Sequence, residues 1–340
     1  MAPEADANTQ LPAAFTWAEY VGRWAADCGG WMPLADALIS RAGDSVGISQ
    51  DPQTVERGLR RLARHGHKPG GQYGRWMLRY FGFVSPVEDV VKWMGQYHTR
   101  FADLPSGLRL EHLMLWNRPP IAESRLACWI QLGIAHVQLG REDLAACEQA
   151  LRHAERHAGK AGPAAEIELG LLRSRIATDA GDHAAARARH LAIEAQLGTA
   201  GLQATDERVY RARLLHQRAL HCTRPPDGAP DLAAARALYQ AIDEEPYVPF
   251  VAFRKCAGLA YCSWRLGDLD EAVRLAERAA EHAGDGGLVR MRVMALNMLS
   301  RVVTGADRTA VNARARRMAT LLEDEDLVSR VAHCTPAPTA

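Results

Sequence analysis

The chain has 340 residues, of which 48% are hydrophobic and 24% are charged, and its formal net charge is +1. This composition is ordinary for a globular protein, and the length allows one elongated array and a smaller domain. Because the charges nearly balance, the totals make no case for binding nucleic acid or membrane, and any such role must rest on local charge. No run of about 18 apolar residues occurs, so we predict no transmembrane helix and no membrane partner.

Cysteine usage and the first residues point to a compartment. The seven cysteines are scattered without paired spacing, as is usual where thiols stay reduced. Residues 1–12 are polar and acidic and lack the basic-then-apolar pattern of a signal peptide. We therefore expect a cytoplasmic protein whose residues 1–12 form a disordered tail.

Aromatic residues divide the chain. Six of the eight tryptophans precede residue 120, whereas the later part is built mainly on Ala and Leu. A Pro pair at 119–120 would stop any helix at this change of composition. We therefore predict an N-terminal helical domain over residues 13–122 and a second part from residue 123.

The N-terminal domain opens with two predicted helices. Thr16 and Glu19 have the spacing of a capping box, and a Gly pair at 29–30 ends the first helix. Pro33 then starts a second helix, which closes at Gly43.

A third predicted helix carries most of the local charge. Asp51 is its N-cap, Pro52 its first residue, and it ends near Arg64. Between residues 57 and 79 the chain has seven Lys or Arg and no Asp or Glu. An apolar stripe at i, i+4 and i+7 is formed by Val55, Leu59 and Leu62.

The stretch from Thr54 to Leu62, TVERGLRRL, resembles the recognition helices of bacterial helix-turn-helix regulators. The resemblance implies DNA binding, although the connection over residues 43–50 is longer than the tight turn of the simplest members. A basic, solvent-exposed helix that packs on its neighbours is the alternative, and Gly58 would allow close approach to a neighbouring helix or to DNA. The candidate DNA-contacting residues are Gln53, Thr54, Arg57, Arg60, Arg61, Arg64 and Lys68.

Three further segments complete this part. Residues 65–71 form a basic loop that we expect to be flexible, as a phosphate contact or a mobile connector. An aromatic helix face at residues 73–81 is expected to be core rather than a nucleic-acid stacking surface. Helices over residues 86–97 and 108–116 are expected to join the domain to the second part of the chain.

One short phrase recurs in the second part: a Gly, or once a Pro, followed five residues later by Ala. The phrases begin at Gly140, Gly181, Pro230, Gly267 and Gly305. Their spacings are 41, 49, 37 and 38 residues, and each lies between two apolar segments with helical period. Recurrence of this kind indicates a stacked helical-repeat array.

The first unit has Trp129, a Leu-Gly pair at 132–133 and an Ala-rich return helix, and the unit around Gly267 preserves the pattern best. This order resembles the tetratricopeptide repeat. The resemblance implies an all-α fold in which about five helix pairs form a superhelix over residues 123–325, with a frayed tail over 326–340. The units are longer than usual, as in bacterial regulators that place such an array behind a DNA-binding domain, sense a peptide or protein and act as homodimers.

A peptide or protein partner is expected on the concave face, which the first helix of each pair lines. The candidate partner-binding residues are Gln131, Gln138, Glu168, Arg173, Arg211, His216, Arg254 and Arg290. Arginine is the commonest of these, which favours an acidic partner or a carboxylate, although each position also fits an ordinary solvated face.

No catalytic motif is found, so we predict no enzyme activity and no cofactor. His153 and His157 are spaced i, i+4, but no acidic third ligand is in register, and we predict no metal site. A DNA-binding regulator and a protein-binding adaptor without DNA contact remain as hypotheses. An enzyme of unrecognised type is the third.

Overall fold

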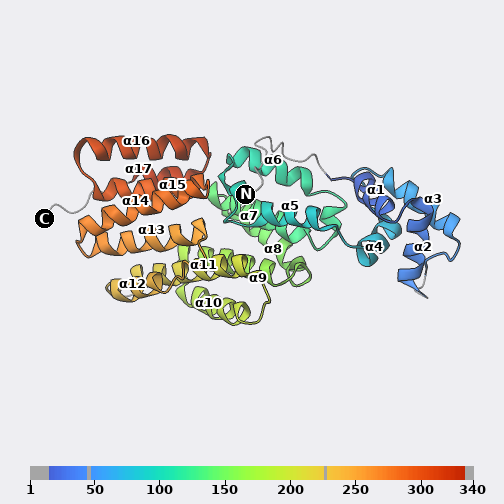
Figure 1. Cartoon of the computed structure of the whole chain (residues 1–340), viewed down its shortest axis with the longest axis horizontal. Helices are drawn as coiled ribbons and strands as arrows, with labels where there is room; N and C mark the ends of the chain where they lie inside the picture. Colours follow the sequence, from blue (N-terminus) through green and yellow to red (C-terminus); the bar gives the residue numbers. More distant parts are fainter. Residues whose placement is uncertain (1–14, 44–46, 226–227, 334–340) are drawn as a thin grey trace.

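The computed structural model describes residues 15–43, 47–225 and 228–333, and the predicted tail over residues 1–12 lies outside these ranges. Seventeen α-helices and two short 3-10 helices make up the described chain, which contains no strand (Figure 1). This confirms the all-α fold class. Across those same ranges, no helix combines the length and the apolar character needed to cross a membrane.

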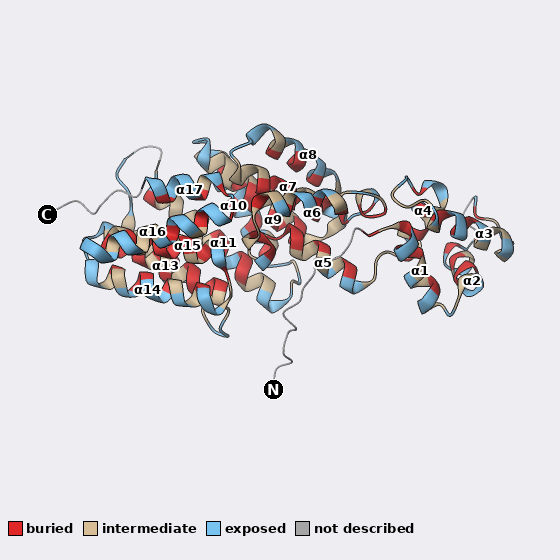
Figure 2. Cartoon of the chain, turned by 90° about the horizontal axis from the view of Figure 1, so that it is seen from above, coloured by how far each residue is buried: buried red, intermediate tan, exposed pale blue. Residues whose placement is uncertain are grey.

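Four helices form a group at one end of the elongated molecule (Figures 1 and 2). They are α1 (Trp17–Asp27), α2 (Trp31–Ala42), α3 (Pro52–Ala63) and α4 (Gly71–Tyr80). The predicted capping box is present, since Thr16 N donates to Glu19 Oε2 at 2.7 Å and Glu19 N to Thr16 Oγ1 at 3.3 Å. The Asp51 carboxylate caps α3 as predicted.

The next helices pack on the second part of the chain. They are α5 (Ser85–Gly95), η1 (Arg100–Asp103), α6 (Ser106–Trp116) and η2 (Ile121–Glu123). Both α5 and α6 contact α7 (Ala127–Gly140). A Cβ atom at Gly133 of α7 would lie 2.8 Å from the Met94 carbonyl oxygen, so the missing side chain permits this close crossing. The helices beyond residue 84 thus pack with the array, although we placed the domain boundary at residue 122.

The α1–α4 group shares a core with the helices that follow it, as far as Leu214. The Phe15 and Trp116 rings stack with centroids 6.1 Å apart, and a continuous cluster of buried residues runs from Phe15 to Leu214. Direct polar links are few, among them His67 Nδ1 to the Pro119 carbonyl oxygen at 3.2 Å. The α1–α4 group is therefore joined to the rest through a narrow contact.

Five consecutive helix pairs follow. They are α7 (Ala127–Gly140) with α8 (Leu144–Ala161), α9 (Pro163–Asp179) with α10 (His183–Leu197), α11 (Ala204–Thr223) with α12 (Leu232–Gln240), α13 (Pro249–Arg265) with α14 (Leu269–Asp285), and α15 (Val289–Val302) with α16 (Gly305–Leu321). The members of each pair contact one another.

The recurring phrase is the turn inside each pair. In the first four pairs an Asp caps the second helix through its side chain, at Asp143, Asp182, Asp231 and Asp268. The residue before the cap has positive φ at Gly181 (80°) and Gly267 (87°), which explains the glycine there. The fifth phrase differs, because Gly305 begins α16 and its N-cap makes no side-chain bond.

The end of the array returns to its beginning. The backbone N–H of Ser106 donates to the Leu322 carbonyl oxygen at 2.9 Å, and that of Arg290 donates to Asp103 Oδ1 at 2.7 Å. The last helix, α17 (Glu325–Ala332), contacts α7. Our prediction of a frayed tail from residue 326 is therefore wrong up to residue 333, because Leu327 and Val331 are buried. Residues 334–340 lie outside the described ranges.

Candidate functional site

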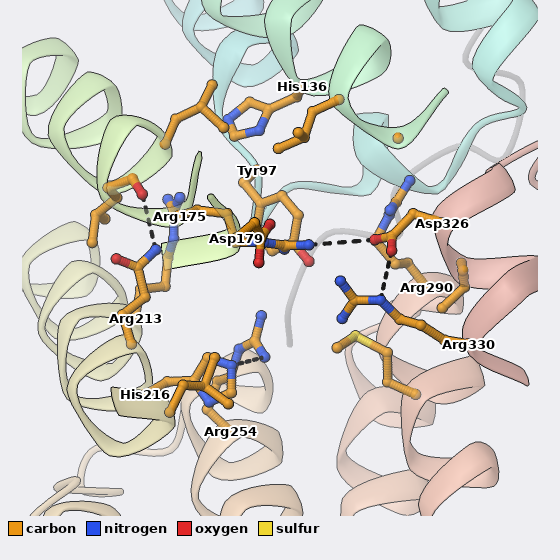
Figure 3. Close-up of a pocket in the computed structure, with 18 of the residues that line it drawn as sticks. Tyr97, His136, Arg175, Asp179, Arg213, His216, Arg254, Arg290, Asp326 and Arg330 are labelled. Carbon is orange, nitrogen blue, oxygen red and sulfur yellow. Dashed lines mark hydrogen bonds and ion pairs between the residues drawn. The ribbon is translucent and has the colours of Figure 1, made fainter. Parts of the chain in front are cut away.

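The closure of the array encloses a pocket with a volume of about 220 Å³ (Figure 3). The first helix of every pair contributes to its wall, together with α17 and the segment between α5 and η1. Its polar wall consists of Tyr97, His136, Arg175, Asp179, Arg213, His216, Gln217, Arg224, Arg254, Arg290, Asp326 and Arg330. Its apolar wall includes Leu139, Leu171, Leu172, Leu220, Met294 and Leu327.

A buried ion pair fixes one side of the pocket. Arg213 on α11 donates to both carboxylate oxygens of Glu168 on α9, at 2.6 and 2.7 Å, and His136 on α7 bonds Glu168 Oε1 at 3.0 Å. Burial alone would raise the pKa of Glu168, but Arg213 and His136 lower that pKa far below its usual range. Three first helices are thus held together by one fully buried carboxylate.

The opposite rim is a second charge network. Arg175 Nε bonds Asp179 at 2.6 Å, and Arg330 Nε bonds Asp326 at 2.7 Å. A contact of 3.4 Å between Arg175 and Asp326 joins α9 to α17. These side chains are only partly buried, so the rim lies at the solvent side of the pocket.

Arg254 differs from the other buried guanidinium groups of the pocket. Its side chain forms no ion pair with any carboxylate of the described chain, although the residue is only 5% exposed. One amino group, Nη1, lies 3.2 Å from His216 Nε2, and Nε has no hydrogen-bond partner. Burial lowers the pKa of Arg254, and the hydrogen bond that Arg254 makes with Tyr97 opposes this lowering only in part.

His216 is a neutral partner of Arg254. Burial, followed by the charge of Arg254, holds the pKa of His216 well below its usual value. Because a guanidinium can only donate, His216 Nε2 must accept, and the ring proton is on Nδ1. That nitrogen lies 3.0 Å from the Tyr239 hydroxyl oxygen. The ring therefore orients Arg254 without neutralising it.

Tyr97 projects into the middle of the pocket, among the guanidinium groups (Figure 3). Burial raises the pKa of its phenol, but Arg254, Arg290, Arg175 and Arg213 outweigh this, and the pKa is lowered. Negative charge at this position is thus stabilised from several sides. The site has the electrostatics of an anion-binding pocket with an apolar wall.

Three of the predicted partner-binding residues, His216, Arg254 and Arg290, are brought together in this pocket. Glu168 is the buried partner of Arg213 rather than a surface residue. The others do not line the pocket: Gln131 bonds Asn117, Arg173 pairs with Glu148 and Glu155 of α8, Arg211 pairs with Glu207, and Gln138 is half-buried. Those arginines face neighbouring acids of the helix pairs.

Several residues of the pocket were not predicted from the sequence. Tyr97 precedes the recurring phrases, and Arg330 lies in the expected frayed tail. His136 was not among the candidate residues. The i, i+4 ion pairs Arg175–Asp179 and Asp326–Arg330 were a readable local signal. Nothing local marks Arg213, which is recognisable only once α9 and α11 are adjacent.

The predicted DNA-contacting residues lie together on α3 and just after it. Gln53, Arg57, Arg60, Arg61, Arg64 and Lys68 are exposed, and Thr54 is half-buried. Arg60 pairs with Glu56 of the same helix at 2.8 Å and lies over the Trp31 ring. Within the described ranges the remaining four cations form no ion pair: Arg57, Arg61, Arg64 and Lys68.

The loop after α3 is anchored, although we expected flexibility there. Trp17 N donates to the Gly66 carbonyl oxygen at 3.2 Å, and Trp17 Nε1 donates to the Lys68 carbonyl oxygen at 3.0 Å. Gly58 serves the contact with a neighbouring helix, because a Cβ atom there would overlap the Tyr73 ring of α4. The backbone that carries Lys68 is therefore held in place.

One further group could hold a metal ion. Glu244, Cys256 and His282 have ligand atoms within 4.8 Å of one another. The Glu244 carboxylate already pairs with Lys255 Nζ at 3.0 Å, so a metal ion would have to displace that cation. Three ligands beside a resident cation make a weak case for metal binding.

Comparison of the chain with protein-family models, curated proteins and solved structures found no match.

Proposed function

We propose that this protein is a non-enzymatic regulator of transcription. The α1–α4 group binds DNA through α3, and the helix pairs form a tetratricopeptide-like superhelix that binds a regulatory ligand at its inner face. The observation that carries the proposal is the set of exposed cations on α3 that have no acidic partner.

The geometry of α3 supports this role. Val55, Leu59 and Leu62 are buried against the other helices, whereas Arg57, Arg61 and Arg64 repeat at i, i+4 and i+7 on the opposite side. Cations presented in a row on an exposed helix suit the phosphate backbone, which supplies much of the affinity for DNA.

The adaptor alternative would pair these arginines with acids of the helix pairs. Within the described chain Arg57, Arg61 and Arg64 pair with no carboxylate, and Arg60 pairs only with Glu56 of α3 itself. The cations are thus free for an external polyanion, and this observation favours DNA over an adaptor that uses the basic face internally.

The inner pocket supports ligand sensing. Residues of all five first helices line it, so one ligand would contact every pair. A ligand that binds one arrangement of the pairs better than another would shift the population towards it. Because the α1–α4 group is joined through a narrow contact, we propose that such a shift changes its placement on DNA.

A gel-shift experiment tests the DNA half of the proposal. Fragments of the genome that encodes the chain are incubated with the full-length protein at low salt, and we expect a shifted complex. The triple variant R57A/R61A/R64A should lose it. The charge-matched variant R156A/R187A/R189A removes three exposed arginines of α8 and α10 and should retain it. Equal binding by the two variants would refute a role for α3.

A further inference from the structure

The pocket contains one more buried positive charge than its own acids neutralise. Four other arginines of the pocket have a carboxylate: Arg213 with Glu168, Arg175 with Asp179, Arg290 with Asp324, and Arg330 with Asp326. Arg224, which also lines the pocket, is exposed to solvent. Arg254 has no carboxylate partner within the described chain and is nine-tenths buried. A buried ion without a counter-charge is costly, so the structure retains an energetic reason to bind an anion at this point.

The surroundings of Arg254 are arranged to present it to the pocket. Its guanidinium lies over the Phe250 and Phe253 rings, 5.2 and 5.5 Å from their centroids, and His216 holds Nη1. Nε has no partner. The Tyr97 hydroxyl oxygen accepts a hydrogen bond from Arg254, so its own O–H can donate to a ligand in the same pocket. Two donors of different kinds therefore converge on one place.

Charge and size together define the ligand. One unpaired guanidinium compensates one negative charge, which suits a carboxylate better than a phosphate dianion. The pocket also has an apolar wall, which includes Leu171, Leu220 and Met294. A volume of about 220 Å³ is below the range of about 300–1,000 Å³ typical of drug-sized ligands, which favours a small ligand.

We propose that the inner pocket binds a compact organic acid, a single carboxylate on an apolar body. Arg254 is its counter-ion, and the Tyr97 hydroxyl is its second donor. This inference rests on the proposed ligand binding by the helix pairs and is independent of DNA binding by α3. It narrows the expected partner from a peptide or protein to a small molecule, or to the last residue of a peptide.

Calorimetry on the full-length protein tests the ligand class. The probes are butanoate, hexanoate and octanoate, with hexanamide as the neutral match for hexanoate. We expect hexanoate to bind and hexanamide to bind at least about tenfold more weakly, the usual effect of losing a charged hydrogen-bond partner. Equal binding of the two, stronger binding of inorganic phosphate, or no binding by any of the three acids overturns the proposal.

Two substitutions locate the site. R254Q should weaken hexanoate binding about tenfold or more, whereas R211Q, at an exposed arginine of α11 that does not line the pocket, should leave it within about twofold. Y97F removes only the hydroxyl and should weaken binding to a smaller extent. Equal losses in R254Q and R211Q would show a general effect of net charge and contradict a specific counter-ion.

The melting temperature is a second measurement. It distinguishes an arginine that binds a ligand from one that only stabilises the fold. Because R254Q removes an uncompensated buried charge, the ligand-free variant should melt at the same or a higher temperature than the wild type. Hexanoate should raise the melting temperature of the wild type and not that of R254Q. A lower melting temperature for ligand-free R254Q contradicts the proposal.

The carboxylate could belong to a small molecule or to the last residue of a peptide. A tripeptide that ends in leucine, tested beside hexanoate, distinguishes the two. Binding of the peptide without binding of hexanoate contradicts the small-acid assignment. Loss of hexanoate binding in R254Q with an intact DNA shift supports the inference. If no acid binds while DNA is still shifted, the ligand assignment alone fails, whereas failure of both assays removes the proposed function as well.

Discussion

Glu168 holds together three helices of the inner face, and its removal should cost much of the stability. Glu168→Gln leaves the Arg213 charge buried without a counter-ion, and breaking such a pair costs about 3–5 kcal/mol. Glu148→Gln is the matched control, because its pair with Arg173 lies at a side chain that is 40% exposed. That change should cost less than about 1 kcal/mol. Urea unfolding of both variants measures the difference, and equal losses would contradict the importance of the buried pair.

His190 makes stability depend on pH. The residue is 4% exposed, and burial, followed by the charge of His221, lowers its pKa to about 4. In the unfolded chain His190 titrates near pH 6.5. Between about pH 4 and pH 6.5 the unfolded state therefore carries a proton on His190 that the folded state lacks. Stability is therefore complete above about pH 6.5 and is lost as the pH falls towards 4. The contribution is on the order of 3 kcal/mol.

The variant H190Q removes this titration. Urea midpoints at pH 7 and pH 5 should differ less in H190Q than in the wild type. Gln keeps a polar group near Ser174 Oγ, which lies 2.6 Å from His190 Nε2. A pH dependence that is identical in the two proteins would show that other groups control the acid sensitivity.

Some helices approach one another so closely that only glycine fits at the contact. Two glycines of the α1–α4 group test this packing. Gly58 of α3 lies under the Tyr73 ring, whereas a Cβ atom at Gly22 of α1 would meet nothing within 4 Å. Gly58→Ala should destabilise by about 1–3 kcal/mol through overpacking. Gly22→Ala should stabilise by up to about 1 kcal/mol, because Ala is the better helix former. Thermal unfolding measures both, and stabilisation by Gly58→Ala would contradict the packing of α4 on α3.

Element boundaries could be read from the sequence where their causes are local. The Thr16 capping box, the Asp51 cap and the Asp residues of the recurring turns act within four residues of themselves. The association of α5 and α6 with α7, and the burial of Leu327 and Val331 on α17, depend on residues far away in the chain. Periodicity could not predict these contacts, and for this reason residues 326–333 were expected to fray.

At the scale of the whole molecule, the closure of the array makes the pocket. Asp324, at 1% exposure, caps α17 through Leu327 N at 2.8 Å and pairs with Arg290 of α15. Asp324→Asn keeps a capping oxygen but leaves Arg290 without this charge, and it should destabilise the fold by about 3 kcal/mol. Urea unfolding measures the loss, and Glu325→Gln at the exposed next position should be neutral. A neutral Asp324→Asn would contradict a structural role for the closure.

The closure also limits what sequence reasoning could find of the site. His216, Arg254 and Arg290 were identified because each is a polar residue on a predicted first helix. Tyr97 and Arg330 join them only because the chain returns to its start, through contacts such as that of Ser106 with Leu322. Packing also decides which arginines face the pocket. Arg173, for example, faces Glu148 and Glu155 of a neighbouring helix instead.

DNA binding by α3 is the central claim, and its salt dependence tests it most directly. The affinity of the full-length protein for a shifted fragment is measured by fluorescence anisotropy at several salt concentrations. Each phosphate contact contributes about 0.9 to the slope of log K against log salt concentration. If Arg57, Arg61 and Arg64 each contact a phosphate, R57A/R61A/R64A should reduce the slope by about 2.7, and R156A/R187A/R189A should leave it unchanged. An unchanged slope in the α3 variant would contradict the claim.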